Sequence, residues 1–426
     1  MKVHSWGLLS NEEHQIELTD SNFKHSNAIG IPMGLGRSYG DAALNPGGAI
    51  WLTSALNHFI AFDEERGEFE CEAGVSLREI QALIIPRGWN LPVTPGTQFV
   101  TVGGAIANDI HGKSHHTYGT FGDQVISLTL RRTDGSEMLC SPEQNSELFA
   151  ATIGGIGLTG LITKARFALV RCASTWIEME SSPFKNLSEF FELSKSSAVG
   201  WESSVAWIDC VGAKAGRGIF MRGNPAAKAE SKKVKERQIG LPFTPPISLV
   251  NKATLRALNT GYFHLNKAKA GNSTVHYQSY FYPLDAISNW NRIYGPKGFY
   301  QYQSVIPPDR AESATQEMMA TIAASGEGSF LAVLKVFGEK TPRGLLSFPM
   351  PGVTLALDFP NRGASTLELF AKLDEIVIRS GGRLYLAKDA RMSRPMFETT
   401  YPNVSEFKKY RDPGISSAMS RRLLGA

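Results

Sequence analysis

Residues 34–41 read GLGRSYGD, and this stretch says more about the fold than any other. Two further glycine-rich stretches follow it, PGTQFVTVGG at residues 95–104 and GGIGLTG at residues 154–160. Glycine has no Cβ, so main chain that contains it can approach a phosphate closely. Three such stretches on one domain-sized length of chain predict backbone amides gathered around one anionic ligand. A single stretch would indicate little.

Length and composition indicate a globular protein with two domains. The chain has 426 residues, more than one ordinary core accommodates, and its 42% of apolar residues is enough to bury two cores. The formal net charge is +4, with both signs interspersed. Because no long basic run or aromatic and basic array accompanies this charge, it argues against a dedicated nucleic-acid binder and leaves phosphate-bearing ligands open.

The cysteines and the apolar runs bear on the compartment. Cys71, Cys140, Cys172 and Cys210 are widely scattered, without the short spacing of a zinc site or a dithiol, so reduced and mostly buried thiols are expected. The start of the chain lacks the apolar core and cleavage site of a signal peptide, and nowhere do eighteen apolar residues run together. We therefore expect a cytoplasmic protein.

The first 175 residues predict short strands and helices in alternation. Ser76 precedes an apolar helical pattern, and Glu79 lies three residues after Ser76. This spacing is the signature of a capping box. Apolar periodicity and turn residues predict hairpins of 59–63 with 69–74 and of 125–131 with 136–140, strands at 28–33, 50–52 and 160–166, and helices at 76–84, 102–108 and 147–151.

The pattern changes from about residue 175 to residue 382. Alternating apolar stretches such as 206–210 and 330–337 are interleaved with helical patterns such as 313–323. This arrangement is typical of an α+β fold in which helices cover one face of an antiparallel sheet.

A basic and then proline-rich segment, residues 228–250, interrupts this pattern. We expect the apolar residues Phe243, Ile247, Leu249 and Val250 in it to be exposed. Two interpretations stay open. The segment is either an ordinary surface loop, which is the commoner case, or a surface for an anionic membrane or a lipid-bearing partner.

Read together, these segments resemble the vanillyl-alcohol-oxidase type of FAD-binding flavoprotein, and within it the decaprenylphosphoryl-ribose 2-oxidase family. The resemblance covers nearly the whole chain, beginning near Trp6. Besides the three glycine-rich stretches, it rests on residues 95–116 with the core IHGKSHH at 110–116, WNRIYGP at 290–296, QYQ at 301–303, LSFP at 346–349 and RLYLAKDAR at 383–391. So many long motifs in the same order make a chance similarity implausible.

The resemblance implies a domain organisation and a cofactor. It implies an α+β fold with a two-subdomain, PCMH-type FAD-binding domain at 1–175, a substrate-binding cap domain with an antiparallel sheet at 176–382, and a C-terminal segment at 383–426 that returns to the FAD-binding domain. The residues that it implies for binding FAD are Gly34, Gly36, Arg37, Ser38, Tyr39, Gly40, Gly96, Thr97, Thr101, Gly103, Gly104, Asn108, His111, Gly112, Gly155, Gly157, Gly160, Ile162 and Tyr385.

Arg37 bears on how the cofactor is held. Related flavoproteins often carry in this loop a histidine that bonds covalently to the flavin, and Arg37 stands at its place. The resemblance therefore implies FAD bound without a covalent link. Such a flavin is expected to pass electrons to a partner rather than react rapidly with oxygen.

Oxidation of an alcohol by a flavin needs a cation near the ring that becomes negative, and a route for the hydroxyl proton. The resemblance implies that Lys388 is the cation; the alternative is a surface lysine paired with Asp389. The resemblance also puts His111 in the active-site region, and its ordinary pKa near neutrality suits a general base or proton shuttle. A purely structural hydrogen-bonding role for His111 is equally open.

Four residues are expected to grip the sugar hydroxyls or the phosphate: Lys113, Tyr39, Gln303 and Lys335. Tyr39 and Lys335 also join Lys388 and His111 as catalytic candidates. Lys335 interrupts an apolar run, and a lysine on a buried strand needs an anionic or hydroxyl partner. Strand alternation would equally allow it an outward-facing position.

A metal site is not expected from the histidines. His111, His115 and His116 are spaced by four and five residues, and Asp109 is the one carboxylate close to them in sequence. This spacing does not suit a metal, so none is assigned.

Two positions depart from the family pattern. Ala356 stands in the substrate pocket where the best-known member has a cysteine, and Thr354 stands where an asparagine is expected. Ala356 belongs to the expected substrate set with Lys113, Gln303 and Lys335. These changes leave the flavin chemistry intact but put the exact sugar and the pocket shape in doubt.

The resemblance implies an FAD-dependent oxidoreductase that oxidises the 2-hydroxyl of a polyprenylphosphoryl ribose to a ketone. A separate NAD(P)H-dependent short-chain reductase would complete the epimerisation to the arabinose donor for cell-wall arabinan. A contact with the inner face of the plasma membrane is the expected refinement of the cytoplasmic location. Two alternatives stay open: a soluble polyol or aldonolactone oxidase of the same superfold, and a non-catalytic flavin-binding subunit.

Overall fold

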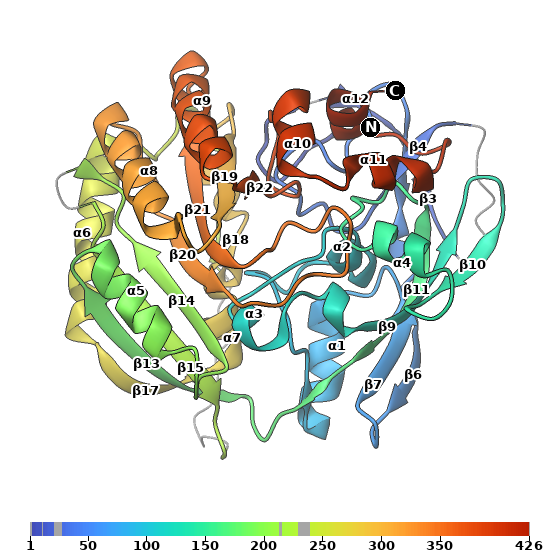
Figure 1. The fold of residues 1–426 in the computed structure, drawn as a ribbon, viewed down its shortest axis with the longest axis horizontal. Coiled ribbons are helices and arrows are strands. Elements are labelled where there is room, and N and C mark those ends of the chain that lie inside the picture. Colours follow the sequence, from blue (N-terminus) through green and yellow to red (C-terminus); the bar gives the residue numbers. More distant parts are fainter. Residues whose placement is uncertain (1, 11, 21–27, 213–214, 229–238, 426) are drawn as a thin grey trace.

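Two assemblies of strands and helices lie side by side in Figure 1, and the chain ends marked N and C both lie on the right-hand one. The computed structural model describes residues 2–10, 12–20, 28–212, 215–228 and 239–425. Nearly all of the basic part of the interrupting segment, residues 229–238, therefore lies outside the described residues.

The first assembly is built on a five-stranded antiparallel sheet and a three-stranded parallel sheet. The five-stranded sheet has the order β10-β9-β11-β7-β6, and both predicted hairpins are confirmed in it. Its strands are β6 (Phe59–Asp63), β7 (Glu68–Glu72), β9 (Val125–Arg131), β10 (Glu137–Cys140) and β11 (Leu161–Ala168). The parallel sheet has the order β3-β5-β4, made of β3 (Gln15–Leu18), β5 (Ala49–Leu52) and β4 (Gly30–Met33).

Short helices join these strands. They are α1 (Leu77–Ile84), α2 (Val102–Ala107), α3 (His115–Tyr118) and α4 (Ser146–Thr152). Helix α1 begins with the predicted capping box, because the Glu79 amide donates to Ser76 Oγ and the Ser76 amide donates to the Glu79 carboxylate. The α1 residues Leu77, Ile80 and Ile84 are buried, so the helix packs its apolar face inward.

The second assembly is an eight-stranded antiparallel sheet, which confirms the expected α+β class. Its order is β17-β13-β15-β14-β20-β21-β19-β22. The strands are β13 (Trp176–Phe184), β14 (Ser203–Ile208), β15 (Gly218–Pro225), β17 (Gly271–His276), β19 (Phe299–Ile306), β20 (Ala332–Phe337), β21 (Gly352–Pro360) and β22 (Arg383–Leu384).

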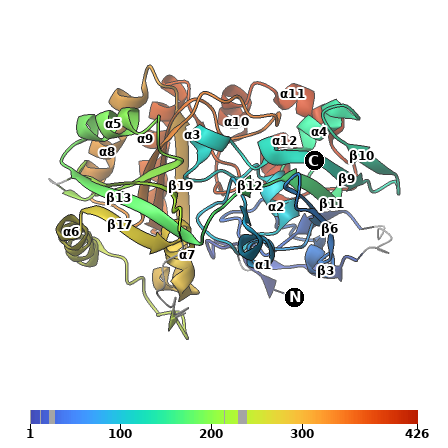
Figure 2. The ribbon, with the colours of Figure 1, turned by 90° about the horizontal axis from the view of Figure 1, so that it is seen from below.

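Helices lie on both faces of this sheet. In Figure 2, α5 (Leu187–Ser196), α8 (Ala311–Ser325) and α9 (Ala364–Arg379) lie on one side and α6 (Lys252–Ala268) on the other. On β14, Ala206 and Ile208 share the core of the first three helices, whereas Trp207 packs with Phe263 of α6. Side chains alternate along a strand, so these residues point to opposite faces. The expectation of helices on one face was therefore incomplete.

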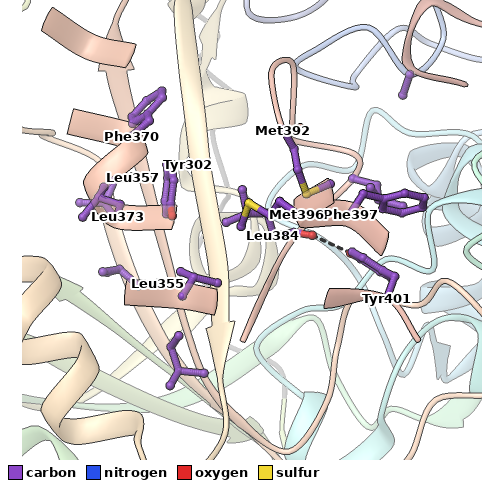
Figure 3. Packing of buried hydrophobic residues seen from close by; sticks show 14 of the residues in the cluster. Tyr302, Leu355, Leu357, Phe370, Leu373, Leu384, Met392, Met396, Phe397 and Tyr401 are labelled. Atoms are coloured by element: carbon purple, nitrogen blue, oxygen red, sulfur yellow. Dashed lines mark hydrogen bonds between the residues drawn. The ribbon is translucent and has the colours of Figure 1, made fainter. Parts of the chain in front are cut away.

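The C-terminal segment packs across both assemblies. Its helices are α10 (Arg394–Thr400), α11 (Val404–Phe407) and α12 (Ala418–Leu424). Figure 3 shows Phe397 and Tyr401 of α10 near Leu384 of β22, and the Tyr401 hydroxyl donates to the Leu384 carbonyl at 2.6 Å. The Ser416 amide donates to the Gly30 carbonyl of β4, which ties the segment to the first assembly.

Short elements complete the fold. Helix α7 is Tyr277–Phe281, and two-residue strands form the pairs β1 (Lys2–Val3) with β2 (Glu12–Glu13), β8 (Trp89–Asn90) with β12 (Val170–Arg171), and β16 (Ile239–Gly240) with β18 (Ile287–Ser288). Phe243, Ile247 and Leu249 are exposed as predicted. The prediction for Val250 is wrong, because it is buried beside Tyr294.

The four cysteines are free and buried, as predicted. Among the helices that the structure describes, none combines the length and apolar character needed to cross a membrane.

Candidate active site

A large cavity is lined by residues of both assemblies, and its volume is about 680 Å³. All four catalytic candidates and all four substrate candidates line it. So do the residues expected to bind FAD, with two exceptions, Gly40 and Gly155. Segments far apart in the sequence therefore meet at one site.

The two exceptions are glycines packed against other main chain. A Cβ on Gly40 would lie 1.8 Å from the Asp389 carbonyl oxygen, and one on Gly155 would lie 2.2 Å from the Ala151 carbonyl oxygen. These distances leave no room for a side chain, so both glycines allow close packing behind the cavity wall.

The glycine-rich stretches form one wall of the cavity. Gly36 and Gly157 have φ of +62° and +76°, in the left-handed region that favours glycine. A Cβ on Gly96 would meet no atom within 4 Å. Since Gly96 lines the cavity, its side-chain direction is open space there. This wall thus exposes main chain rather than side chains.

This wall also offers unused polar groups. Within the described part of the chain, the amides of Leu35, Gly36, Arg37 and Ser38 have no hydrogen-bond acceptor. The Asn108 amide nitrogen donates to the Gly104 carbonyl, while its Oδ1 is buried without a partner. Buried polar groups are nearly always paired, so this set indicates a ligand with acceptors and donors of its own.

The opposite wall is one face of the eight-stranded sheet. Ladder pairing sets Gln303 of β19 beside Ala356 of β21, and Ala356 beside Val333 of β20. Lys335 is two residues beyond Val333, so it points to the same face. All four residues line the cavity. Lys335 therefore does lie on the face of the sheet that points away from the helix-covered core, but that face borders the cavity.

Burial changes the charge state of the two lysines on the substrate side. It lowers the pKa of Lys335 to about 8. Burial and, to a lesser degree, the charge of Lys335 lower the pKa of Lys113 to about 7. The Lys113 ammonium donates to the Tyr280 carbonyl and lies 4.3 Å from the centre of the Tyr280 ring. Bound anions would stabilise the charged form of both lysines.

Lys388 lies in the turn after β22. The Tyr39 amide donates to the Ala387 carbonyl, and the Lys388 ammonium lies 3.9 Å from the centre of the Tyr39 ring. Among the described residues, no carboxylate forms an ion pair with Lys388; Asp389 instead lies 3.0 Å from Arg422. The surface-lysine alternative is therefore wrong.

Lys388 shares its buried surroundings with Asp358. Burial lowers the pKa of Lys388, and the charge of Asp358 opposes this shift. Burial raises the pKa of Asp358, which accepts a 2.6 Å hydrogen bond from Gln301 Nε2. A buried ammonium without an ion-pair partner is available to a ligand that becomes anionic.

His111 lies in an aromatic cage. Its ring centre is 4.9 Å from that of Phe337 and 5.1 Å from that of Tyr385. Gln303 Nε2 lies 2.9 Å from His111 Nε2 and 3.1 Å from Thr354 Oγ1. An amide nitrogen only donates, so His111 Nε2 accepts and its hydrogen resides on Nδ1. Nδ1 is buried without a partner, which leaves a donor for the ligand.

Burial lowers the pKa of His111 well below its usual value, and the nearby Lys335 lowers it further. His111 is therefore neutral at physiological pH. In the described ranges, no group of three or more His, Cys, Asp or Glu side chains is placed to hold a metal ion.

Sequence reasoning missed several residues that line the cavity. Gln301 was quoted only as part of a motif, and Trp6, Tyr262, Asp285 and Ile287 were not singled out. Gln301 could have been found by alternation, since it lies two residues before Gln303 on the same strand. The others come from separate loops and helices, and no local pattern relates them to the cavity.

Comparison with known proteins matches residues 22–141 to a family described as an FAD binding domain. The decaprenylphosphoryl-beta-D-ribose oxidase of Mycolicibacterium smegmatis is 37% identical over 414 residues, which are 92% of this chain and 88% of that protein. The Delta(24)-sterol reductase of Rattus norvegicus is 30% identical over 32% of this chain and 26% of its own length. The L-gulonolactone oxidase of Mus musculus is 30% identical over 30% of this chain and 29% of its own length.

The cavity fits FAD on its own chemistry. The free amides of residues 35–38 suit an anionic pyrophosphate, and the open side of Gly96 leaves room for it. Asn108 Oδ1 and His111 Nδ1 supply an acceptor and a donor for a polar ring edge. Lys388 adds a cation from the far end of the chain.

Proposed function

The chain belongs to the decaprenylphosphoryl-beta-D-ribose oxidase family, and we propose that it oxidises the 2-hydroxyl of a polyprenylphosphoryl ribose to the 2-keto sugar. It is an FAD-dependent oxidoreductase. The observation that carries the proposal is a single cavity with a phosphate-binding main-chain wall and a polar, lysine-bearing sheet face opposite. The 37% identity to that oxidase extends over 92% of this chain, so it includes the residues of both walls.

FAD supplies, when bound, an acceptor for the hydride that leaves the sugar C2. The residues of the chain hold the reactants and balance charge. The charge of Asp358 favours the charged form of Lys388 against the effect of burial on its pKa. A cation at this position stabilises developing negative charge more strongly than it would in water. The Tyr39 ring beneath its ammonium fixes the position of that charge.

Lys335, Lys113 and Gln303 bind the phosphorylated sugar in this proposal. They share the cavity, and both lysines gain charge when an anion approaches. Ala356 lies on the same face as Gln303 and provides space rather than a polar contact. Thr354 accepts from Gln303, so it orients the amide that contacts His111.

His111 takes part as a neutral ring. Its Nδ1–H is the donor that faces the ligand, and its Nε2 accepts from Gln303. It can receive the hydroxyl proton on Nε2 only when the Gln303 amide turns away. We therefore assign His111 mainly to holding an oxygen of the reactants through its Nδ1–H, and to accepting the hydroxyl proton on Nε2 only when the Gln303 amide has turned away.

The ketone must be reduced on its other face to give the epimer. That step requires a hydride donor, and we propose a separate NAD(P)H-dependent reductase as the partner. We also propose that the protein works at the inner face of the membrane that holds its lipid-linked substrate.

A soluble lactone or polyol oxidase remains the comparison case. The similarity to L-gulonolactone oxidase spans less than a third of this chain. Lys335, Gln303 and Ala356 lie on the sheet face that would distinguish the two substrates. A lipid-phosphate substrate makes better use of the two buried lysines than a neutral lactone does.

The product tests the proposal. We expect farnesylphosphoryl ribose, incubated with the protein and an artificial electron acceptor, to yield a ketone that borodeuteride labels at C2. The labelled products should include both ribose and arabinose. Label at another carbon, or turnover with free lactones alone, would overturn the proposed reaction.

A further inference from the structure

Helix α6 carries a second apolar stripe that faces solvent. Leu255, Asn259 and Phe263 form its buried side. Leu258 and Leu265, seven residues apart, are 57% and 64% exposed. Residues at this spacing lie on one side of a helix, so the stripe is continuous. Scattered single apolar residues are ordinary on a surface, but a stripe along one helix is not.

The segment that leads into α6 extends this stripe. Residues 241–250 hold exposed Phe243 and Ile247. Their main chain is anchored, because Arg292 donates to the Leu241 carbonyl and the Leu249 amide donates to the Ile293 carbonyl. Thus the apolar side chains project from a fixed backbone. In Figure 2 this segment and α6 both lie on the lower edge of the molecule, away from α5, α8 and α9.

The apolar surface is continuous with the rim of the cavity. Tyr262 of α6 and Ile287 of β18 both line the cavity and are 41% and 39% exposed. Ile239 of β16 pairs directly with Ile287 and is also exposed. The surface therefore runs from the mouth of the cavity, along the anchored segment, to α6.

The exposed charge on this surface is positive, whereas the neighbouring carboxylate beside β18, Asp285, is half-buried and accepts a hydrogen bond from the Gln98 amide. From residue 239 to residue 284 the chain has four basic residues, Lys252, Arg256, Lys267 and Lys269, and no Asp or Glu. All four are exposed. The whole chain has nearly equal numbers of both signs, 44 basic and 40 acidic residues. An acid-free stretch beside exposed leucines therefore complements an anionic and apolar partner.

We propose that this surface, formed by α6, residues 239–251 and β18, docks onto an anionic lipid bilayer with the cavity mouth toward the lipid. The proposal rests on the proposed function only for the nature of the substrate. Leucines and aromatic residues would enter the interface, and the lysines and arginine would meet the lipid phosphates. A lipid-linked sugar could then enter the cavity while its tail stays in the bilayer.

Vesicle binding tests the docking without turnover. The full-length, FAD-loaded protein should sediment with phosphatidylglycerol vesicles, and much less with phosphatidylcholine vesicles. The double variant Leu258→Ser, Leu265→Ser should lower the partition coefficient by about tenfold or more, because each leucine loses its burial in lipid. Lys267→Gln with Lys269→Gln should lower it by about fivefold per charge on anionic vesicles alone.

A matched control exists on α9, where Leu367 and Ile378 are 42% and 40% exposed. Serine at both positions should leave vesicle binding unchanged. Equal binding of the wild type and the Leu258, Leu265 variant would overturn the proposal, as would equal binding to neutral and anionic vesicles. A dimer that this variant dissociates, without vesicle binding, would assign the face to a second copy instead.

The two proposals fail separately. Oxidation of detergent-dispersed farnesylphosphoryl ribose reports the reaction, and neither Leu258 nor Leu265 lines the cavity. We expect the Leu258, Leu265 variant to retain that oxidation while losing vesicle binding. Vesicle binding by a protein that oxidises no prenylphosphoryl sugar would keep the docking surface and reject the reaction.

Discussion

Lys388 makes the most specific prediction at the scale of single residues. It is half-buried in the cavity wall, it lies over the Tyr39 ring, and no carboxylate of the described chain forms an ion pair with it. Lys388→Ala should lower the rate constant of flavin reduction by about 100-fold or more, the loss typical of one preorganised electrostatic contact. Stopped-flow measurement of flavin reduction would give this value.

The exposed Lys164 on β11 provides the control for Lys388, because Lys164→Ala removes a charge of the same kind from a residue that does not line the cavity. Its turnover should equal that of the wild type. Both variants should keep the melting temperature of the parent. Turnover of Lys388→Ala within twofold of the wild type would reject the assigned role.

Lys335 predicts a dependence of substrate binding on pH. Burial lowers its pKa to about 8, so it is charged below that pH and neutral above it. An anionic substrate binds the charged form, and KM should therefore rise as pH increases through about 8. In Lys335→Met the inflection near pH 8 should be lost and KM should be high at every pH, so that the remaining dependence on pH comes from Lys113. An unchanged inflection in the variant would assign the titration to another group.

At the scale of elements, close packing of glycines supports the site. A Cβ on Gly40 would lie 1.8 Å from the Asp389 carbonyl, in the turn that carries Lys388. Gly40→Ala should lower the free energy of unfolding by about 1–3 kcal/mol through overpacking. Urea denaturation measures this difference.

Gly261 in the middle of α6 is the matched control for Gly40. An added Cβ there meets nothing within 4 Å, and the residue is helical. Gly261→Ala should raise the free energy of unfolding by about 0.5–1 kcal/mol, because alanine loses less conformational freedom in a helix. Equal effects of the two substitutions would contradict the packing argument.

The elements also divide what the sequence could predict from what it could not. The β6–β7 hairpin and the Ser76 capping box depend on residues close in sequence, and both were predicted. The row Gln303, Ala356, Val333 depends on pairing between strands far apart in the chain. Alternation within β20 left two faces for Lys335, and only that pairing decides between them.

The position of α6 shows the same limit. Its buried residues Leu255 and Phe263 follow a helical period, which the sequence contains. The sequence did not predict which face of the sheet α6 covers. Ala206 and Trp207 are adjacent on β14 and both apolar, yet they point to opposite faces. The rim residue Tyr262 of α6 was missed for this reason. The three glycine-rich stretches could be singled out from the sequence because glycines cluster within short motifs, and all three line the cavity.

At the scale of the whole molecule, half-buried ion pairs join the C-terminal helix α12 to the site. Arg422 of α12 lies 2.8 Å from Asp41 and 3.0 Å from Asp389. Arg422→Met would leave both carboxylates without this partner. It should lower the free energy of unfolding by about 2 kcal/mol and loosen the turn of Lys388.

Thermal unfolding and flavin retention measure the Arg422 effect together. A matched control is Arg379→Met on α9, whose pair with Glu317 is largely exposed. Such exposed pairs contribute about 0–1 kcal/mol. If Arg422→Met were as stable as Arg379→Met, the ion pairs of Arg422 would not contribute to the free energy of unfolding.

The central claim is that one cavity, built by both assemblies, brings FAD and a polyprenylphosphoryl ribose together. The direct test is an absorbance spectrum of the purified protein without oxygen, before and after addition of farnesylphosphoryl ribose. We predict that the bands of oxidised flavin disappear on addition. A flavin spectrum that stays unchanged with this sugar would contradict the claim.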